Sequence, residues 1–300
     1  MIVRALFLLP FVALVACTPG RESRLIIGSK NFSEQVVLAE LLAQHLENRT
    51  GLEVERRFYL GGTYICQQAL LADRMDLYVE YTGTALTAIL KEPPQSSSAA
   101  VYARVRDQYA RRFNLEVTEP LGFDNTFAIV VRGEDARRLG LRTISDAARY
   151  APQWRAGFGY EFMERPDGYA GLAQTYGLGF AAPPRIMDLG LLYRALLEKQ
   201  VDLVAGNSTD GLIAALDLVV LEDDRRYFPP YEAVPIVRRE TLARHPQVRT
   251  ALAELAGIIS DAEMRELNYA VDGERRDVKE VVREFLQSKG LTPNVAKRTR

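Results

Sequence analysis

Three polar loops carry the side chains with the most chemistry in this 300-residue chain, and each one joins an apolar strand pattern to a helical pattern. They cover residues 28–35 (GSKNFSEQ), 80–84 (EYTGT) and 206–211 (GNSTDG). Free N–H groups and the dipole at a helix N-terminus favour an anionic group, and Lys30 adds a full positive charge. Each loop alone is equally typical of an ordinary turn. Together they lie where a ligand cleft would need polar groups.

The elements that must position these loops alternate from Arg24 onward, which is typical of α/β architecture. Residues 25–27 predict a buried strand, followed by a helix with an apolar face that ends near Gly51. Asn31 and Glu34, three residues apart, form a plausible capping pair for that helix. The same alternation predicts strands at 52–58, 76–80, 127–131, 154–159, around Ile186, 201–205, 218–221 and 234–237, and helices at 64–74, 84–91, 101–113, 168–176, 191–199, 239–245, 247–258, 261–270 and 274–288.

Two segments with proline suggest where the chain divides. Residues 120–122 (PLG) lead out of a first lobe and 228–231 (FPPY) lead back into it. The pattern predicts a two-lobe α/β protein with parallel-type sheets flanked by helices. Lobe one comprises residues 24–122 and 232–300, and lobe two comprises residues 123–231. Such a protein keeps its ligand in the cleft between the lobes, near strand C-termini and helix N-termini.

The composition excludes several classes of function. The net charge of −1 supplies no basic footprint for nucleic acid. Two histidines, far apart at 45 and 245, argue against a histidine-rich metal centre or a histidine-based triad. Two cysteines cannot build a zinc ribbon or a multi-disulfide scaffold. We expect no metal, no cofactor and a monomer.

The N-terminus predicts export. Arg4 precedes an apolar run from 5 to 15, which is too short to span a bilayer as a helix. Residues 14–17 (LVAC) resemble the lipobox of bacterial lipoproteins. That resemblance implies a signal peptide at 1–16, a lipid on Cys17, a tether at 17–23, and a periplasmic or cell-surface location at the membrane. The alternative is a plain buried N-terminal helix. With Cys17 lipidated, Cys66 has no disulfide partner.

Eight stretches together resemble the substrate-binding proteins of ABC importers for glycine betaine, choline and related osmoprotectants. They follow the family order across about two thirds of the chain. They are GSKNFSEQ (28–35), GGT (61–63), DLYVEYTGT (76–84), DNTF (124–127), EF with RPDG (161–168), STDG (208–211), LEDD (221–224) and FPPY (228–231). The resemblance implies a two-lobe periplasmic-binding-protein fold that closes at a hinge, and ABC permease and ATPase partners.

In that family tyrosines surround a trimethylammonium head, and basic and hydroxyl groups hold the carboxylate. A quaternary ammonium has no N–H to donate, so attraction to aromatic faces remains, worth about 0.5–2 kcal/mol per ring. The resemblance assigns Tyr81 and Tyr231 to the cage, and Lys30, Thr84 and Arg165 to the carboxylate. Phe127 and Asn207 stand where tyrosine is usual. The predicted binding set is Lys30, Tyr81, Thr84, Asn125, Phe127, Arg165, Asn207 and Tyr231.

Plainer interpretations stand beside these. Tyr81 and Phe127 also fit packed core aromatics, and Arg165 fits an ion pair with Asp124 or Glu161. Further alternatives are helix caps at Asp167 and Asp210, a buried small residue at Cys66, extra cleft surface from Tyr160 and Trp154, and either a metal cluster or an acidic surface turn at 222–224.

We interpret the chain as an exported, lipid-anchored solute-binding protein for an ABC importer, with a small quaternary or methylated amine as ligand. Binding to both lobes at once would supply the differential affinity that closure requires. A different amine, an amino acid or a thio-containing betaine is the alternative ligand, since Asn207 leaves space. A sensor without a transport partner is a second alternative. An enzyme is a third, although no nucleophile elbow or phosphate loop is present.

Overall fold

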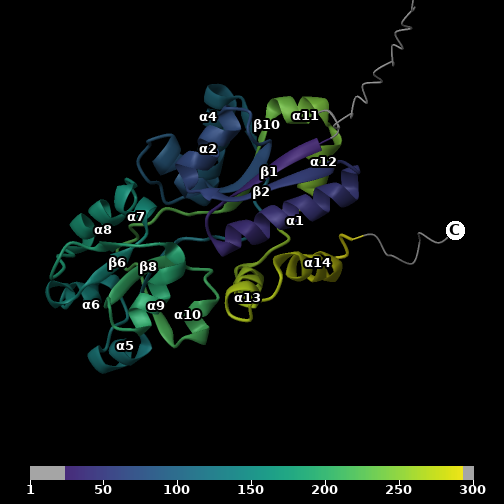
Figure 1. The fold of residues 1–300 in the computed structure, drawn as a ribbon. Helices are drawn as coiled ribbons and strands as arrows, with labels where there is room; N and C mark the ends of the chain where they lie inside the picture. The colour runs from purple at the N-terminus through teal and green to yellow at the C-terminus, as the bar shows by residue number, and fades with distance from the viewer. Residues whose placement is uncertain (1–23, 293–300) are drawn as a thin grey trace, which may run out of the picture.

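The computed structural model describes residues 24–292, in which two five-stranded sheets each carry their own helices (Figure 1). The first sheet has the order β2–β1–β3–β10–β4. We call this sheet and its helices lobe one. Its strands are β1 (Arg24–Lys30), β2 (Glu53–Gly61), β3 (Leu77–Tyr81), β4 (Leu115–Val117) and β10 (Ala233–Arg238).

The second sheet has the order β7–β6–β8–β5–β9, and we call it and its helices lobe two. Its strands are β5 (Phe127–Arg132), β6 (Ala156–Phe158), β7 (Arg185–Ile186), β8 (Leu203–Asn207) and β9 (Leu218–Leu221). The prediction of a two-lobe α/β fold is confirmed. The prediction of parallel-type sheets is only partly right, because β10 runs antiparallel to β3 and β4, and β5 runs antiparallel to β8 and β9.

The antiparallel strands follow from how the chain changes lobes. It leaves lobe one between β4 and β5 and returns between β9 and β10 through two crossover segments, residues 118–126 and 222–232. These pair with each other: Asn125 N donates to Tyr231 O at 3.1 Å, and Asp124 and Glu232 form an antiparallel bridge. Each crossover leads directly into an antiparallel strand. The proposed lobe boundaries at 122/123 and 231/232 fall within these segments.

The first helix shows why lobe one folds as it does. α1 (Ser33–Thr50) buries apolar side chains on more than one face, against the sheet and against α12, α13 and α14 (Figure 1). It ends at Gly51, whose φ of 69° gives the left-handed conformation that glycine adopts most easily. The other helices of lobe one are α2 (Thr63–Leu71), α3 (Thr82–Thr84), α4 (Ser98–Phe113), α11 (Arg239–Arg244), α12 (Gln247–Ala253), α13 (Asp261–Asp272) and α14 (Val278–Ser288).

Lobe two is built on shorter elements. Its apolar core lies on both faces of the second sheet. The sequence missed α5, α6, α7 and α10 of lobe two and β4 of lobe one, because elements of three to seven residues show too little periodicity to be recognised. The helices are α5 (Gly133–Leu139), α6 (Ile144–Ala148), α7 (Tyr160–Glu164), α8 (Tyr169–Tyr176), α9 (Leu192–Leu197) and α10 (Leu212–Ala215).

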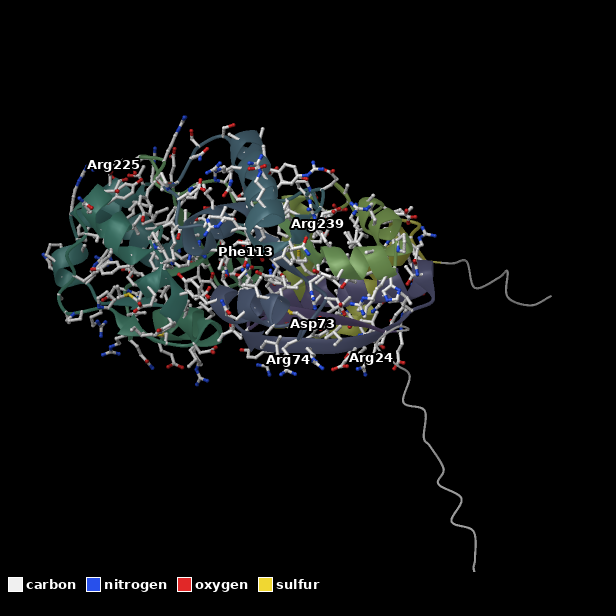
Figure 2. All side chains as sticks on the ribbon, turned by 90° about the horizontal axis from the view of Figure 1, so that it is seen from above. Arg24, Asp73, Arg74, Phe113, Arg225 and Arg239 are labelled. Carbon is white, nitrogen blue, oxygen red and sulfur yellow. The ribbon has the colours of Figure 1, made fainter. Side chains whose placement is uncertain are left out.

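The two lobes lie side by side along the long axis of the molecule. Seen from above, Arg225 marks the outer part of lobe two, while Arg24 lies on lobe one toward the opposite end (Figure 2). Within residues 24–292, no helix combines the length and apolar character needed to cross a membrane. The predicted signal peptide, Cys17 and the tether lie outside the described residues.

Candidate binding cleft

A cleft of about 680 Å³ opens between the two lobes. All eight residues of the predicted binding set line it: Lys30, Tyr81, Thr84, Asn125, Phe127, Arg165, Asn207 and Tyr231. The structure therefore brings together side chains that are up to 201 residues apart in sequence. A volume of this size lies in the range of small-molecule sites. Whether these eight side chains hold a ligand stays a prediction.

Strand ends place most of these side chains. Lys30 is the last residue of β1 and Tyr81 the last of β3, two strands of one sheet. Phe127, the first residue of β5, lies opposite Asn207, the last residue of β8, because the two strands are antiparallel. Asn125 and Tyr231 come from the two crossover segments. The cleft is thus lined by strand ends of both sheets and by the crossovers that join them.

Aromatic rings cluster on one side of the cleft. The ring centroids of Phe127 and Tyr231 are 5.9 Å apart with an interplanar angle of 76°. The ring of Phe127 also contacts that of Phe162 in α7, and their centroids are 4.8 Å apart. Phe162 lines the cleft and was missed as a site residue; the stretch EF at 161–162 was its only signal. Edge-to-face packing of this kind fixes ring orientation.

Lys30 lies at the centre of the lobe-one wall. Its Nζ forms an ion pair with the fully buried carboxylate of Glu80 and a 3.2 Å hydrogen bond to Thr63 Oγ1. It also lies 4.6 Å from the centroid of Tyr81. Glu80 Oε1 in turn accepts a hydrogen bond from the Tyr81 backbone N–H at 2.8 Å. Glu80 therefore fixes the ammonium group and compensates its charge.

Arg165 is paired in the same way, with Asp167. Its Nε donates to Asp167 Oδ1 at 2.9 Å, and Nη2 donates to Oδ2. The guanidinium carbon lies 4.8 Å from the Phe127 centroid and 5.8 Å from that of Tyr231. The Tyr231 hydroxyl donates to Asp167 Oδ2 at 2.6 Å. Burial opposes ionisation of Asp167, but the charge and hydrogen bonds of Arg165 outweigh it and lower the pKa.

Two sequence interpretations of this region are therefore wrong. Arg165 pairs with neither Asp124 nor Glu161, because Asp167, two residues along, forms a two-point contact with the guanidinium. Asp167 does not cap α8; Gly168 is its N-cap, and no side chain caps it. The Asp167 carboxylate faces the cleft wall instead, where it joins Arg165 to Tyr231.

Glu34 is the functional candidate that sequence reasoning misassigned. It was expected to cap α1 with Asn31, but Phe32 is the N-cap and no side-chain cap bond forms. The Glu34 carboxylate is instead 2% exposed and accepts hydrogen bonds from Tyr81, Asn125, Thr209 and Asn268. Burial raises its pKa, and the four hydrogen bonds only partly offset that effect. Its place in GSKNFSEQ, at the turn into α1, was the available signal.

Asn207 and Thr84 complete the wall. Thr84 is buried in α3. The Asn207 backbone N–H donates to Asp210 Oδ2 at 2.9 Å, and the Asn207 amide donates to Oδ1 at 3.4 Å. Asp210 was expected to cap a helix, but Gly211 is the N-cap of α10. Burial raises the pKa of Asp210 to about 6. Asp210 therefore supports the turn that presents Asn207.

The mouth of the cleft carries exposed aromatic and apolar side chains. Tyr160 is 65% exposed and lines the cleft, as the sequence suggested. Trp154 does not line it; its ring stacks on that of Tyr150, with centroids 5.8 Å apart, and both partly buried side chains pack against the core of lobe two. Cys66 is a free, buried cysteine of α2, and burial raises the pKa of its thiol to about 12. It is the small buried residue that was expected.

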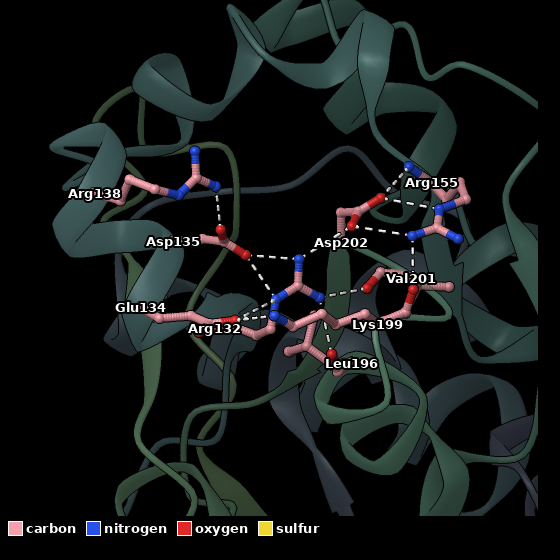
Figure 3. A network of polar contacts seen from close by, with 9 residues as sticks. All are labelled: Arg132, Glu134, Asp135, Arg138, Arg155, Leu196, Lys199, Val201 and Asp202. Atoms are coloured by element: carbon pink, nitrogen blue, oxygen red, sulfur yellow. Dashed lines mark hydrogen bonds and ion pairs between the residues drawn. The ribbon is translucent and has the colours of Figure 1, made fainter.

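A network behind the cleft supports the end of β5. Arg132 donates to the carbonyl oxygens of Leu196 and Val201, at 2.8 and 2.7 Å, and pairs with Asp135 and Asp202 (Figure 3). Asp202 immediately precedes β8, which ends at Asn207. The network therefore joins the end of β5 to α5, to α9 and to the start of β8, and it fixes the positions of these elements relative to one another.

Within residues 24–292, no cluster of three or more histidine, cysteine or acidic side chains is placed to hold a metal ion. Asp223 accepts hydrogen bonds from the backbone N–H groups of Tyr227 and Phe228, and Asp224 accepts one from Ser145. The acidic segment 222–224 is thus an ordered turn in the second crossover.

Comparison with known proteins gives this cleft its context. A family model described as the substrate-binding domain of the ABC-type glycine betaine transport system matches residues 23–288. The chain is 36% identical over 265 residues to the carnitine transport binding protein of Listeria monocytogenes, covering 87% of this chain and 85% of that one. It is 33% identical over 288 residues to the ergothioneine transport permease/ergothioneine binding protein of Helicobacter pylori, covering 96% of this chain and half of that longer protein.

The fold leads to the same family. A solved structure of a glycine betaine/carnitine/choline ABC transporter protein superimposes with a TM-score of 0.73 at 34% identity, covering 89% of this chain and 99% of that one. Members of the family are transport substrate-binding proteins and form no known enzyme class. Because the family model covers most of the chain and the relatives exceed 30% identity over most of it, the chain belongs to the family of substrate-binding domains of ABC-type glycine betaine transport systems.

Proposed function

We propose that this protein binds a small quaternary amine or related zwitterion of the glycine betaine, choline or carnitine type outside the cytoplasm and delivers it to an ABC importer. The observation that carries the proposal is the convergence of all eight predicted binding residues on one inter-lobe cleft. The family and the names of the relatives support the same ligand class. Closure of the lobes would bury the ligand and present the closed form to the permease and its ATPase.

The aromatic cluster supplies the affinity for a methylated ammonium. Tyr81, Phe127 and Tyr231 present π faces or edges to the cleft, where each ring is worth about 0.5–2 kcal/mol depending on desolvation. Such a ligand needs no hydrogen bond at its cationic end. The rings therefore recognise it by charge and shape.

Lys30, Arg165 and Thr84 would hold a ligand carboxylate. Of the three N–H donors of Lys30, two are used by Glu80 and Thr63, which leaves one. Arg165 uses two of its five N–H groups on Asp167, which leaves three. Their charges are already balanced, so we assign these residues a role in directing a carboxylate by hydrogen bonds more than in attracting it.

A larger ligand is the second candidate. Asn207 contributes a short amide where a ring would narrow the cleft, so an aromatic or thio-containing betaine has room there. The ergothioneine name of one relative supports testing this class. We further propose that the chain is a monomer, that Cys17 carries a lipid anchor at the membrane, and that no catalytic turnover occurs.

A thermal-shift screen of the chain from Thr18 onward tests the function. The panel contains glycine betaine, choline, carnitine, proline betaine, ergothioneine and several common amino acids. A ligand at 100 times its Kd stabilises the fold by about 2.7 kcal/mol, which is visible as a rise in melting temperature. We expect quaternary amines to raise it and Tyr81→Ala to abolish the rise. A rise only with an ordinary amino acid would overturn the proposal.

A further inference from the structure

The carboxylate of Glu34 joins parts of the molecule that are otherwise separate. Its Oε1 accepts hydrogen bonds from the Tyr81 hydroxyl at 2.5 Å and from Asn125 Nδ2 at 2.7 Å. Its Oε2 accepts from Thr209 Oγ1 at 2.5 Å and from Asn268 Nδ2 at 2.8 Å. These donors come from the end of β3, the first crossover segment, the turn after β8 in lobe two, and α13.

The hydrogen-bonding capacity of Glu34 is filled by the protein itself. A carboxylate offers about four lone-pair sites, and four protein donors occupy them. Asn268 Nδ2 also donates to the Thr209 carbonyl oxygen at 2.9 Å, so that amide cannot turn its oxygen toward Glu34 without opposing a second acceptor. Glu34 therefore has no capacity left for a ligand. It acts on other residues and is a positioning residue.

The Tyr81 and Thr209 hydroxyls share this carboxylate as an acceptor. The Tyr81 ring lines the cleft from lobe one, and Thr209 lies in lobe two, beyond Asn207. Both hydroxyls donate to Glu34, to different oxygens. When the lobes separate, the Thr209 contact must lengthen, because Thr209 is the donor to Glu34 that belongs to the body of lobe two.

We infer that Glu34 couples the binding ring Tyr81 to lobe closure, by holding the Tyr81 hydroxyl and the Thr209 hydroxyl on one carboxylate in the closed form. The inference rests on the proposed function, since it requires a ligand that contacts Tyr81. Closure adds the Thr209 hydrogen bond, and that bond steadies the carboxylate that orients the ring. The ligand is then released only after this contact breaks.

A double-mutant cycle in ligand binding tests the coupling. The variants are Tyr81→Phe, which keeps the ring, Thr209→Val, which keeps the shape, and the two combined, with Thr175→Val on α8 as a matched control in the same lobe. Association and dissociation rates are measured by stopped flow with glycine betaine and with choline. The melting temperature without ligand is measured for each variant.

We expect Thr209→Val to speed dissociation about tenfold, as for loss of a hydrogen bond to a charged group, with association changed less than twofold. Tyr81→Phe should also speed dissociation. The double variant should be at least threefold less impaired than the product of the two effects, since the residues share one partner. Thr175→Val should bind as the parent does.

The outcomes separate the inference from the proposed function. If the parent protein binds neither these two probes nor any other betaine or quaternary amine of the screening panel, the proposed function fails and the inference fails with it. If it binds, but the two effects multiply or Thr209→Val leaves dissociation unchanged, the coupling is wrong. A fall in melting temperature with unchanged dissociation means that Glu34 only stabilises the fold, which also overturns the inference. Glu34→Gln gives a second check, because it keeps the size of the side chain and should reduce the Tyr81–Thr209 coupling.

Discussion

Substitution of Gly211 by alanine tests whether the lobes meet where the structure places them. Gly211 lies between β8 and α10 in lobe two, with φ −63° and ψ −25°, a conformation that alanine adopts freely. A Cβ at this position would lie 2.4 Å from the backbone N and 2.6 Å from the Cα of Tyr269 in α13 of lobe one. The added methyl group therefore opposes contact between the lobes, and the atoms nearest to it belong to lobe one.

The structure sets the size of the effect. Ordinary contact with a Cβ begins near 3.4 Å, so α13 and the Gly211 turn must separate by about 1 Å. Overpacking of this kind costs about 1–3 kcal/mol, which corresponds to roughly 5- to 150-fold weaker ligand binding. In the unliganded protein the lobes can relax apart. There the loss of glycine should leave stability unchanged or raise it by about 0.4–1 kcal/mol through the unfolded state.

Isothermal titration calorimetry with glycine betaine and choline, and urea unfolding without ligand, measure the two quantities. The matched control is Gly179→Ala, because Gly179 is also in a loop of lobe two and an added Cβ there meets no atom within 4 Å. Unchanged affinity in Gly211→Ala would refute the closure contact. An equal loss of affinity and of unliganded stability would show that the contact is permanent, which also contradicts the reasoning.

Three further expectations follow from the cleft. Gly62→Ala places a Cβ 2.1 Å from Glu161 Oε1, the end of a flexible side chain that can turn away, so calorimetry should show ligand affinity within about twofold of the parent; a larger loss that the Gly62→Ala/Glu161→Ala double variant restores would show that Glu161 is held in place. Asn207→Tyr should strengthen glycine betaine binding roughly 2- to 30-fold while weakening larger betaines, and a gain for both would reject the idea of an enlarged cleft. Burial raises the pKa of Asp124 and of Asp210 to about 6, above their value in the unfolded chain. The folded state therefore takes up protons first, and stability should rise as the pH falls from 7 toward 5. Urea unfolding should show Asp210→Asn removing about 1.3 kcal/mol of the change between pH 7 and pH 5, and an unaltered slope would disprove the assignment.

Most of the fold could be predicted from the sequence because its main elements are long enough to show a period. α1 and the strands β1, β3 and β8 carry clear apolar runs bounded by turn residues. The strand directions could not be predicted in the same way. An apolar run has the same pattern in a parallel and an antiparallel pairing, and only the two crossover segments determine which one forms.

The residues that line the cleft could be predicted from the sequence, but the contacts that they make could not. The family motifs identified the eight lining residues. The partners of Lys30, Arg165 and Glu34 depend instead on the three-dimensional arrangement of the strands and helices. Glu80 is the natural partner of Lys30 only once β1 and β3 lie side by side. Glu34 resembles a helix cap in sequence because capping patterns and buried acceptors use the same residue type at the same position. Only tertiary packing separates the two roles.

The position of Trp154 has a practical consequence for ligand assays. It is the only tryptophan of the chain, and its partly buried ring stacks on Tyr150 against the core of lobe two, away from the cleft lining. A hinge motion carries this pair as one body, so the surroundings of the indole stay the same. We therefore expect the intrinsic tryptophan fluorescence of this protein to stay the same when a ligand binds. A fluorophore introduced at Tyr160, at the mouth of the cleft, would report on the ligand directly.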